Sequence, residues 1–283
     1  IGDVYNHLHE LVTDKEATQG TPTGFSGLDR VLAGMGKSDL VLVGARPSMG
    51  KTSFAINMLS NAARKGAKVA FFSLEMPREQ IAMRMLCSEA KVDMQKIRSG
   101  TLSDGDWMKL ARSLAPLAAT NIYIDDTSAI NTTEMKSKLR RINNLGLVVI
   151  DYIGLMQSTS NSDNRAQQVG EISRNLKIMA KDFGVPIICC AQLNRGTESR
   201  PGAGKRPTLA DLRDSGSIEQ DADIVLFLYR DDYYNEDSEK RNIAECIVAK
   251  NRHGETGKVE LRWMPEYTTF ATLDNRYGDD EYD

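Results

Sequence analysis

Residues 40–52 read LVLVGARPSMGKT: an apolar run, a short loop, and then Gly50, Lys51 and Thr52 at the start of a helical pattern. A strand that leads through such a loop into a helix is the setting of a phosphate-binding loop, because backbone amides and the helix N-terminus attract phosphate oxygens. Lys51 would then reach the β- and γ-phosphates, and Thr52 would bind Mg²⁺. The predicted nucleotide-binding residues are Ser48, Met49, Gly50, Lys51, Thr52 and Ser53.

The loop departs from the usual glycine-rich pattern at its first position, which is Ala45, while Gly44 lies one residue early. Alanine is tolerated there if its backbone φ angle is negative. The alternative interpretation is a chance Gly-Lys-Thr at a helix start, which the strand–loop–helix setting disfavours.

Around this stretch, short apolar runs alternate with helical patterns. Strands are predicted at 40–43, 69–72, 122–124, 147–150, 186–191 and 224–229, and helices at 53–65, 78–90, 103–117, 133–143 and 166–183. β-formers separated by helices of this length predict an α/β fold with a mostly parallel central sheet flanked by helices. Apolar runs at 244–250, 258–263 and 270–273 follow one another closely, so we expect an antiparallel C-terminal extension at one sheet edge.

Polar side chains follow three of the predicted strands. Asp151 ends one strand, Glu75 follows a second and Gln192 ends a third. Because the carboxyl ends of parallel strands meet at one edge of a sheet, we expect all three near the phosphate loop. Asp151 would then share Mg²⁺ with Thr52, Glu75 would deprotonate the attacking water, and Gln192 would sense the γ-phosphate. The alternative for Glu75 is a solvated acid at a helix start.

Composition excludes several protein classes. The chain has 283 residues with 36 basic and 39 acidic side chains, and 41% of its residues are hydrophobic, so global disorder is excluded. The net charge of −3 argues weakly against a protein that coats nucleic acid, but four of the acids lie in the last five residues. No apolar stretch approaches the roughly 18 residues that cross a bilayer. We therefore expect a cytoplasmic protein without membrane contact.

Cysteine and histidine usage points away from a metal centre built on these side chains. The four cysteines, Cys87, Cys189, Cys190 and Cys246, lack metal-ligand spacing and are predicted to be reduced and buried. With three histidines in the chain, we expect neither a zinc site nor a histidine-based catalytic site.

Two kinds of segment lie outside the predicted core. Residues 1–15 carry an apolar stripe, with Ile1, Val4, Leu8 and Leu11 on one helical face, and a linker rich in Gly, Thr and Pro follows at 17–24. Such a helix docks either on its own domain or on a neighbouring subunit. The polar loops 158–165 and 194–207 follow strands and are expected at the ligand-binding edge of the sheet. The chain lacks a starting Met, so we expect it to be part of a longer protein.

Four segments together resemble a known family. TGFSGLD at 23–29, ARPSMGKT at 45–52, SLEM at 73–76 and DLRDSGSIEQDAD at 211–223 resemble the C-terminal motor domain of DnaB-type replicative helicases of bacteria and phages. The resemblance covers nearly the whole chain. It implies a RecA-like phosphate-loop NTPase fold preceded by a linker helix that docks on the adjacent subunit. It also implies domain bounds of 1–20 for the linker, 21–274 for the motor and 275–283 for an acidic tail.

The resemblance also implies roles for individual residues. Lys51, Thr52 and Asp151 would bind ATP with Mg²⁺, Glu75 would be the catalytic base, and Gln192 would be the γ-phosphate sensor. Arg84 matches a family arginine near the nucleotide, with a surface helix charge as the alternative. Lys250 and Arg252 would reach the γ-phosphate held by the next subunit, which would make hydrolysis depend on a homohexameric ring. The alternative for this pair is a solvated pair on an edge strand.

For nucleic acid, the resemblance points to Arg213, Asp214 and Gly216 as residues that grip single-stranded DNA. The neighbouring stretch 195–213 holds five basic side chains against two acidic ones. The alternative for the overlapping loop 194–207 is a solvent loop that does not contact DNA. The absence of an aromatic residue from that loop argues for backbone tracking rather than base stacking. Primase and a helicase loader are the further partners that the resemblance implies for the full-length protein.

The expected function is an ATP-dependent replicative DNA helicase motor that threads single-stranded DNA and unwinds duplex at the fork. Two alternatives remain open from the sequence. One is a strand-exchange recombinase, which uses the same core to form filaments on DNA. The other is a non-motor ATPase regulator, which would bind ATP without DNA-stimulated hydrolysis.

Overall fold

The computed structural model describes residues 20–159, 164–194 and 205–273. The predicted N-terminal helix, most of the 194–207 loop and the acidic tail lie outside these residues. The described residues form a nine-stranded sheet. Its strands are β1 (Leu40–Ala45), β2 (Lys68–Ser73), β3 (Ile122–Asp125), β4 (Leu145–Asp151), β5 (Ile187–Gln192), β6 (Ile224–Arg230), β7 (Ile243–Asn251), β8 (Gly257–Met264) and β9 (Thr269–Thr272).

The sheet has the order β3-β2-β4-β5-β1-β6-β7-β8-β9. Neighbouring strands from β3 to β6 are parallel, whereas β7, β8 and β9 continue the sheet in antiparallel pairs. The predicted mostly parallel sheet with an antiparallel C-terminal extension is therefore confirmed. In register, Ala45 lies beside Gln192 and Ser73 lies beside Asp151, so these strand ends share one edge of the sheet.

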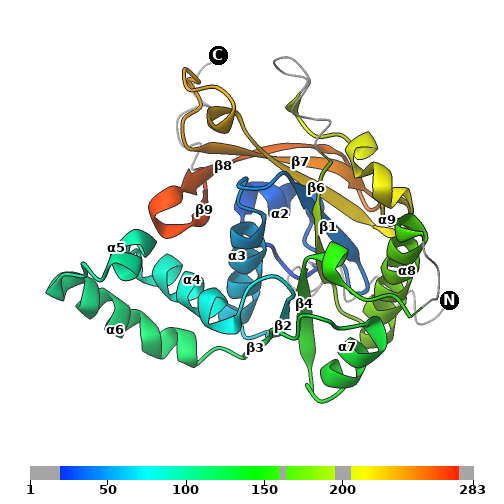
Figure 1. Cartoon of the computed structure of the whole chain (residues 1–283), viewed down its shortest axis with the longest axis horizontal. Coiled ribbons are helices and arrows are strands. Elements are labelled where there is room, and N and C mark those ends of the chain that lie inside the picture. The colour runs from blue at the N-terminus through cyan, green and yellow to red at the C-terminus, as the bar shows by residue number, and fades with distance from the viewer. Residues whose placement is uncertain (1–19, 160–163, 195–204, 274–283) are drawn as a thin grey trace, which may run out of the picture.

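Helices cover both faces of the sheet (Figure 1). Alternate residues of each strand point to opposite faces, and two hydrophobic cores result. Val41 and Val43 of β1 face one core, which contains buried residues of α3 (Lys51–Arg64) and α4 (Arg78–Ala90). Leu40 and Leu42 face the other core, against α7 (Thr132–Leu139), α8 (Arg165–Phe183) and α9 (Gly216–Asp221). Parallel strands buried on both faces explain the continuous apolar runs of the sequence.

The five helices expected within the described residues all form, but short ones were missed. The helix expected at 133–143 ends at Leu139. The sequence patterns did not predict α2 (Ser26–Leu32), α5 (Met94–Ser99) or α9. Short 3₁₀ helices also form: η1 (Ile153–Leu155), η4 (Leu209–Ser215), η5 (Asp231–Tyr233) and η6 (Pro265–Tyr267).

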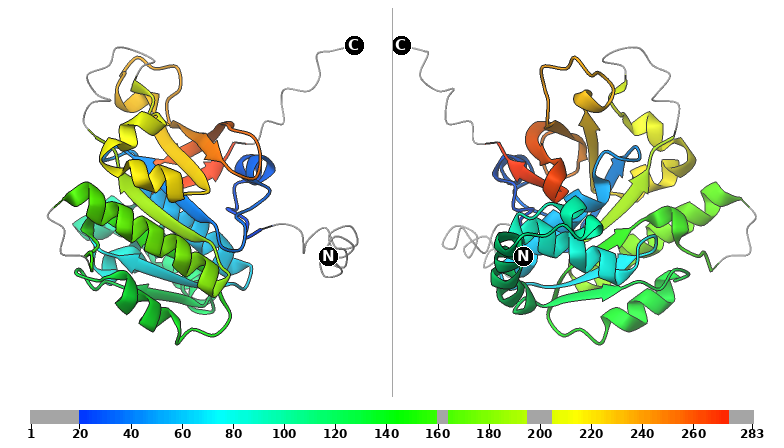
Figure 2. Two further views of the ribbon diagram at one scale, coloured as in Figure 1. Left: turned by 90° about the vertical axis from the view of Figure 1, so that its right-hand side faces the viewer. Right: turned by 60° about the vertical axis from the view of Figure 1, so that its left-hand side comes forward.

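Helices α4, α5 and α6 (Asp104–Ala118) extend away from the sheet at the lower left of Figure 1, and they come to the front in the right-hand view of Figure 2. The outer helix, α6, exposes three large apolar side chains: Trp107 is 60% exposed, and Met108 and Leu114 are similarly open.

No helix among the described residues is long and apolar enough to span a membrane. The four cysteines are buried free thiols, as predicted.

Candidate nucleotide-binding site

The phosphate loop joins β1 to α3 in the predicted geometry. Ser48 and Gly50 have positive φ angles of 67° and 92°, which turn the chain tightly before the helix begins at Lys51. A Cβ atom at Gly50 would lie 2.7 Å from Cζ of Phe270, so glycine is required there for space as well as for φ. Ala45 ends the strand and is not among the positive-φ residues, which confirms that alanine is tolerated at this position.

Lys51, Thr52 and Asp151 form one cluster at the carboxyl edge of the sheet. The Thr52 hydroxyl donates to Asp151 Oδ2 at 2.5 Å, and Lys51 Nζ lies 3.2 Å from Asp151 Oδ1. Burial is the largest single effect on the pKa of Lys51 and lowers it, but the charge and hydrogen bond of Asp151 together with the charges of other nearby acidic groups leave the pKa raised, so the amine stays protonated. Lys51 Nζ also lies 4.4 Å from the ring centroid of Tyr152, a cation–π contact that the sequence did not predict.

The same cluster suits a hard divalent cation. Asp151 Oδ1 is buried and, apart from its ion pair with Lys51, has no hydrogen-bond partner among the described residues, and the adjacent Thr52 hydroxyl adds a second oxygen. Oxygen donors are the ligands that Mg²⁺ prefers, and Mg²⁺ commonly takes one carboxylate together with phosphate and water oxygens. No group of three or more His, Cys, Asp or Glu side chains suited to a metal occurs in the described part of the chain. A cation here would therefore depend on nucleotide phosphates for part of its coordination.

A pocket of about 460 Å³ opens beside the loop and brings most of the predicted residues together. Its lining includes Glu75, which is exposed just after β2, and Gln192, which is exposed at the end of β5. Arg84 of α4 also lines the pocket, so it is not merely a surface helix charge. Met49, by contrast, is a buried core residue and does not line the pocket.

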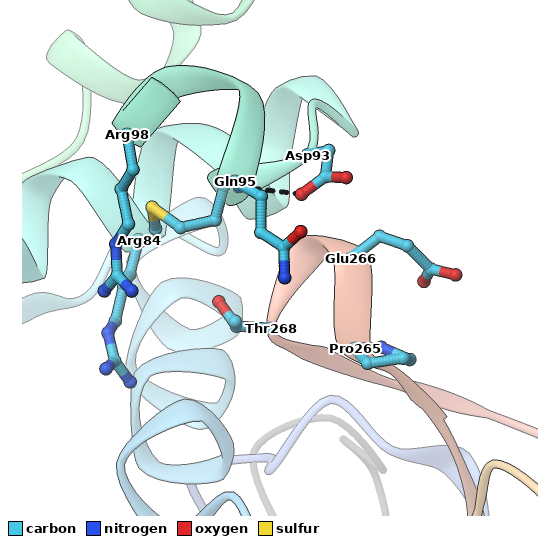
Figure 3. A pocket seen from close by; sticks show the side chains of 8 residues that line it. Arg84, Asp93, Gln95, Arg98, Pro265, Glu266 and Thr268 are labelled. Atoms are coloured by element: carbon cyan, nitrogen blue, oxygen red, sulfur yellow. Dashed lines mark hydrogen bonds between the residues drawn. The ribbon is translucent and has the colours of Figure 1, made fainter. Parts of the chain in front are cut away.

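A second pocket of about 410 Å³ adjoins the first and was not predicted from the sequence. Arg84 and Thr268 line both pockets. In Figure 3, Arg84 and Arg98 lie side by side on one wall, while Asp93 and Glu266 lie opposite. Burial, and then the positive charge of Arg98, lower the pKa of Arg84. The Thr268 hydroxyl is buried and has no hydrogen-bond partner in the described residues.

Sequence reasoning also missed the side chain that ties the phosphate loop to the strand carrying Gln192. Arg46 is buried, and its Nη1 donates to the backbone oxygen of Leu193 at 2.7 Å. Leu193 N–H in turn donates to the oxygen of Ala45 at 3.2 Å. The contact joins residues 147 positions apart, which no local pattern reveals.

Lys250 and Arg252 do not join this cluster. In register, Lys250 lies beside Val225 at the start of β6, whereas Ala45 lies beside Leu228 near its end. The pair therefore lies at the amino edge of the parallel strands, opposite the phosphate loop of the same chain. The solvated edge-strand alternative holds only in part. The pairing of β7 with β8 stops at Val248 and Arg252 is 54% exposed, but Lys250 Nζ is bonded to carbonyl oxygens of Glu219 and Ala222.

The residues expected to contact DNA fall at the junction of η4 and α9, and the side chains of residues 213–216 lie outside the description. The positive charge predicted for the stretch 195–213 is not all available to DNA, because two of its basic side chains contact other residues of the protein. Arg206 forms a bidentate ion pair with the buried carboxylate of Glu245, and Lys205 Nζ lies 5.0 Å from the ring centroid of Tyr234. Tyr234 shows that an aromatic side chain adjoins this loop although the loop contains none.

Comparison with known proteins agrees with this geometry. The profile of a family described as "DnaB-like helicase C terminal domain" matches residues 20–272. The replicative DNA helicase DnaC of Bacillus subtilis (strain 168) is 48% identical over 280 residues, which are 97% of this chain and 61% of that protein. The replicative DNA helicase DnaB of Geobacillus stearothermophilus is 48% identical with the same coverage. The chain thus spans about three fifths of the length of these curated relatives.

Two solved structures have the same fold. One, described as an ATPase domain, superposes with a TM-score of 0.90 at 37% identity, covering 97% of this chain and all of that one. A DnaB-like replicative helicase, described with its interactions with primase, superposes with a TM-score of 0.89 at 37% identity, covering 96% of this chain and 66% of that one.

Proposed function

Because this chain belongs to the DnaB-like helicase C-terminal domain family, we propose that it is the ATP-hydrolysing motor domain of a replicative DNA helicase. Its RecA-like α/β fold is that of its structural relatives. The observation that carries the proposal is the division of the chemistry between two sheet edges: the phosphate loop with Asp151 and Glu75 on one, Lys250 and Arg252 on the other.

Hydrolysis would proceed in the pocket beside the phosphate loop. ATP would place its β- and γ-phosphates against the loop amides and Lys51, and Mg²⁺, held by Thr52 and Asp151, would neutralise phosphate charge. Glu75 is exposed to the pocket and can accept a proton from the attacking water. Gln192 ends the strand that precedes the 194–207 loop, so a contact with the γ-phosphate would report nucleotide state to that loop.

The ribose and base would extend from this pocket toward the second one. Arg84 and Thr268 line both pockets, so in the proposed pose they would lie near the ribose as it leaves the phosphates. Trp263 lines the first pocket and offers an apolar surface to the same part of the ligand. The site therefore has room for a whole nucleoside triphosphate.

We further propose that catalysis is completed between subunits of a homohexamer. Lys250 and Arg252 are separated from their own phosphate loop by the length of β1, about 3.3 Å per residue over six residues, so they serve an ATP bound by a neighbour. Residues 1–20 would act as the linker that docks on the adjacent subunit. The exposed apolar side chains of α6, Trp107 among them, are a candidate surface for its apolar stripe.

Single-stranded DNA would pass through the ring. Arg213, Asp214 and Gly216 are the proposed DNA contacts, within a motor domain spanning 21–274 that is followed by an acidic tail at 275–283. A helicase loader and primase are the proposed further partners of the longer protein, and primase is named with one structural relative.

The test is unwinding of a forked duplex by the assembled protein, with ATP hydrolysis measured with and without single-stranded DNA. Wild type should hydrolyse faster with DNA and should unwind the fork. Glu75→Gln should lose about 10²–10⁴-fold in turnover while retaining nucleotide binding, because only proton transfer is removed. Glu79→Gln is the matched control, since Glu79 is 73% exposed and pairs only with Arg78 in the described residues. Wild type that neither responds to DNA nor unwinds would exclude the proposal.

A further inference from the structure

Backbone oxygens at the carboxyl end of α9 bind the side chain of Lys250. The Nζ atom of Lys250 donates to the backbone oxygen of Glu219 at 2.6 Å and to that of Ala222 at 2.7 Å. The last carbonyls of a helix have no partner within the helix and carry the negative end of its dipole. A lysine from β7 therefore satisfies them, and the position of Lys250 depends on the position of α9.

Asp223, just beyond α9, holds Arg252. The Arg252 N–H donates to the Asp223 backbone oxygen at 2.9 Å, and Arg252 Nη1 lies 3.1 Å from Asp223 Oδ1. The carboxylate itself is held in place, because Oδ2 accepts from Leu40 N–H at 2.8 Å and from Lys177 Nζ at 2.5 Å. Asp223 is a buried, fixed anchor for both backbone and side chain of Arg252.

The Arg252 side chain is nonetheless open on its outer side. It is 54% exposed, whereas the Asp223 side chain is 2% exposed. A guanidinium has five N–H donors, so one ion pair leaves donors free to meet a phosphate from outside the chain. Burial, and then the charge of Arg252, lower the pKa of Lys250. The charges of Asp223, Glu219 and Asp221 act in the opposite direction without cancelling these effects, so a further anion such as an incoming phosphate would favour the charged form of Lys250.

The other end of α9 begins at Gly216, directly after η4. The six residues of α9 span about 9 Å. The proposed DNA contacts and the residues that hold Lys250 and Arg252 are therefore one short helix apart. Two residues of α8 one turn apart hold α9 in place: Ser173 bonds to Asp221, and Lys177 bonds to Asp223. The helix α9 and its contacts with α8 therefore form a continuous hydrogen-bonded path from residues 213–216 to Asp223.

On the basis of the proposed function, we propose that Asp223 is a positioning residue for the trans-acting Arg252. We also propose that α9 couples single-stranded DNA at residues 213–216 to ATP hydrolysis in the neighbouring subunit. In this arrangement, DNA bound by one subunit changes the positions of Lys250 and Arg252 in that subunit. These two cations then contact the γ-phosphate held by the next subunit. The coupling therefore runs through the backbone carbonyls of α9 and one buried carboxylate.

The experiment mixes wild-type chains with carrier chains that cannot hydrolyse ATP. The first carrier is Lys51→Ala, which keeps its own Asp223 and Arg252; the second is Lys51→Ala with Asp223→Asn. In an equal mixture about half of the wild-type sites face a carrier's cation pair, so DNA-stimulated hydrolysis per wild-type chain should fall about twofold further with the second carrier. Incorporation of each carrier is checked by native mass spectrometry.

A purely structural role is separated by a third carrier, Lys51→Ala with Asp39→Asn. It removes another buried carboxylate, the partner of His253, but leaves the contact between Asp223 and Arg252. We expect it to match the first carrier, and an equal loss with it would overturn the inference. Should Asp223→Asn not assemble, Asp223→Glu keeps the charge but moves the carboxylate by one methylene, and it should show the same loss in trans.

Failure of the inference is distinct from failure of the proposed function. If wild type is stimulated by DNA and the first two carrier series coincide, Asp223 does not position the trans pair. If undoped wild type shows no DNA-stimulated hydrolysis, the proposed function fails and the inference fails with it.

Discussion

Arg206→Met should destabilise the protein because it strips a buried carboxylate of its main partner. The Glu245 side chain is 2% exposed in β7, and Arg206 donates to it twice, from Nε at 2.6 Å and from Nη2 at 2.9 Å. The guanidinium also lies 4.9 Å from the ring centroid of Tyr229. Methionine keeps the apolar stem but removes the charge and both hydrogen bonds.

The magnitude follows from what remains near the carboxylate. Removing one partner of a buried ion pair costs about 3–5 kcal/mol when the other charge is left alone. Here Lys258 Nζ lies 3.4 Å and Lys240 Nζ 3.8 Å from Glu245 Oε1, so we expect about 2 kcal/mol for Arg206→Met. The reverse change, Glu245→Gln, should cost about 1 kcal/mol, because Arg206 is 33% exposed and can be rehydrated.

The assay is urea unfolding of both variants and the wild type, at neutral pH and at about pH 3.5. The hydrogen bonds from Arg206 lower the pKa of Glu245, against the opposing effect of burial. A carboxylate with a lowered folded-state pKa contributes stability that is present above its unfolded pKa, about 4.3, and is lost as the pH falls through the folded value. The cost of Arg206→Met should therefore shrink in acid.

Two results would refute this reasoning. One is a cost for Glu245→Gln equal to or above that of Arg206→Met, and the other is a cost of Arg206→Met that does not change between the two pH values. Arg241→Met serves as the control, because Arg241 is exposed in the same region and its described hydrogen bond is to the Glu236 backbone oxygen. It should change stability by less than about 0.5 kcal/mol.

Three further changes test the site and the assembly. Gly50→Ala should lower nucleotide affinity at least about tenfold in a fluorescent-nucleotide titration, since its Cβ would meet Phe270, whereas Gly66→Ala has a similar φ of +90° with open space and should leave affinity unchanged. Equal affinities would contradict the steric argument. Trp107→Ser should weaken ring assembly in sedimentation while changing unfolding free energy by less than about 0.5 kcal/mol; unchanged assembly would remove α6 from the interface. Arg84→Ala should weaken ATP binding more than Arg98→Ala, because Arg84 alone of the two lines the phosphate pocket; the reverse order would exclude this placement.

Local patterns were sufficient for the long elements and insufficient for the short ones. All nine strands form where apolar runs predicted them, and the signal is strongest for central strands such as β1, β5 and β6, because a strand buried on both faces needs continuous apolar residues. By contrast, α5 and α9 have six residues each, well short of the window of about 11–18 residues in which an amphipathic repeat can be recognised. The helix expected to reach residue 143 ends at Leu139, since polar and charged residues there can leave the helix without losing buried contacts.

The sequence by itself determined the phosphate loop and the polar residues that surround it. Asp151, Glu75 and Gln192 could be placed together because the carboxyl ends of parallel strands meet at one edge, whatever the order of the strands. The tertiary structure alone decided the partners of Lys250, Arg252 and Arg206. Those partners are backbone carbonyls and buried acids on other elements, and they depend on β7 lying beside β6. Strand order is set by packing of the whole chain rather than by any local pattern, so these contacts could not be read before the fold was known.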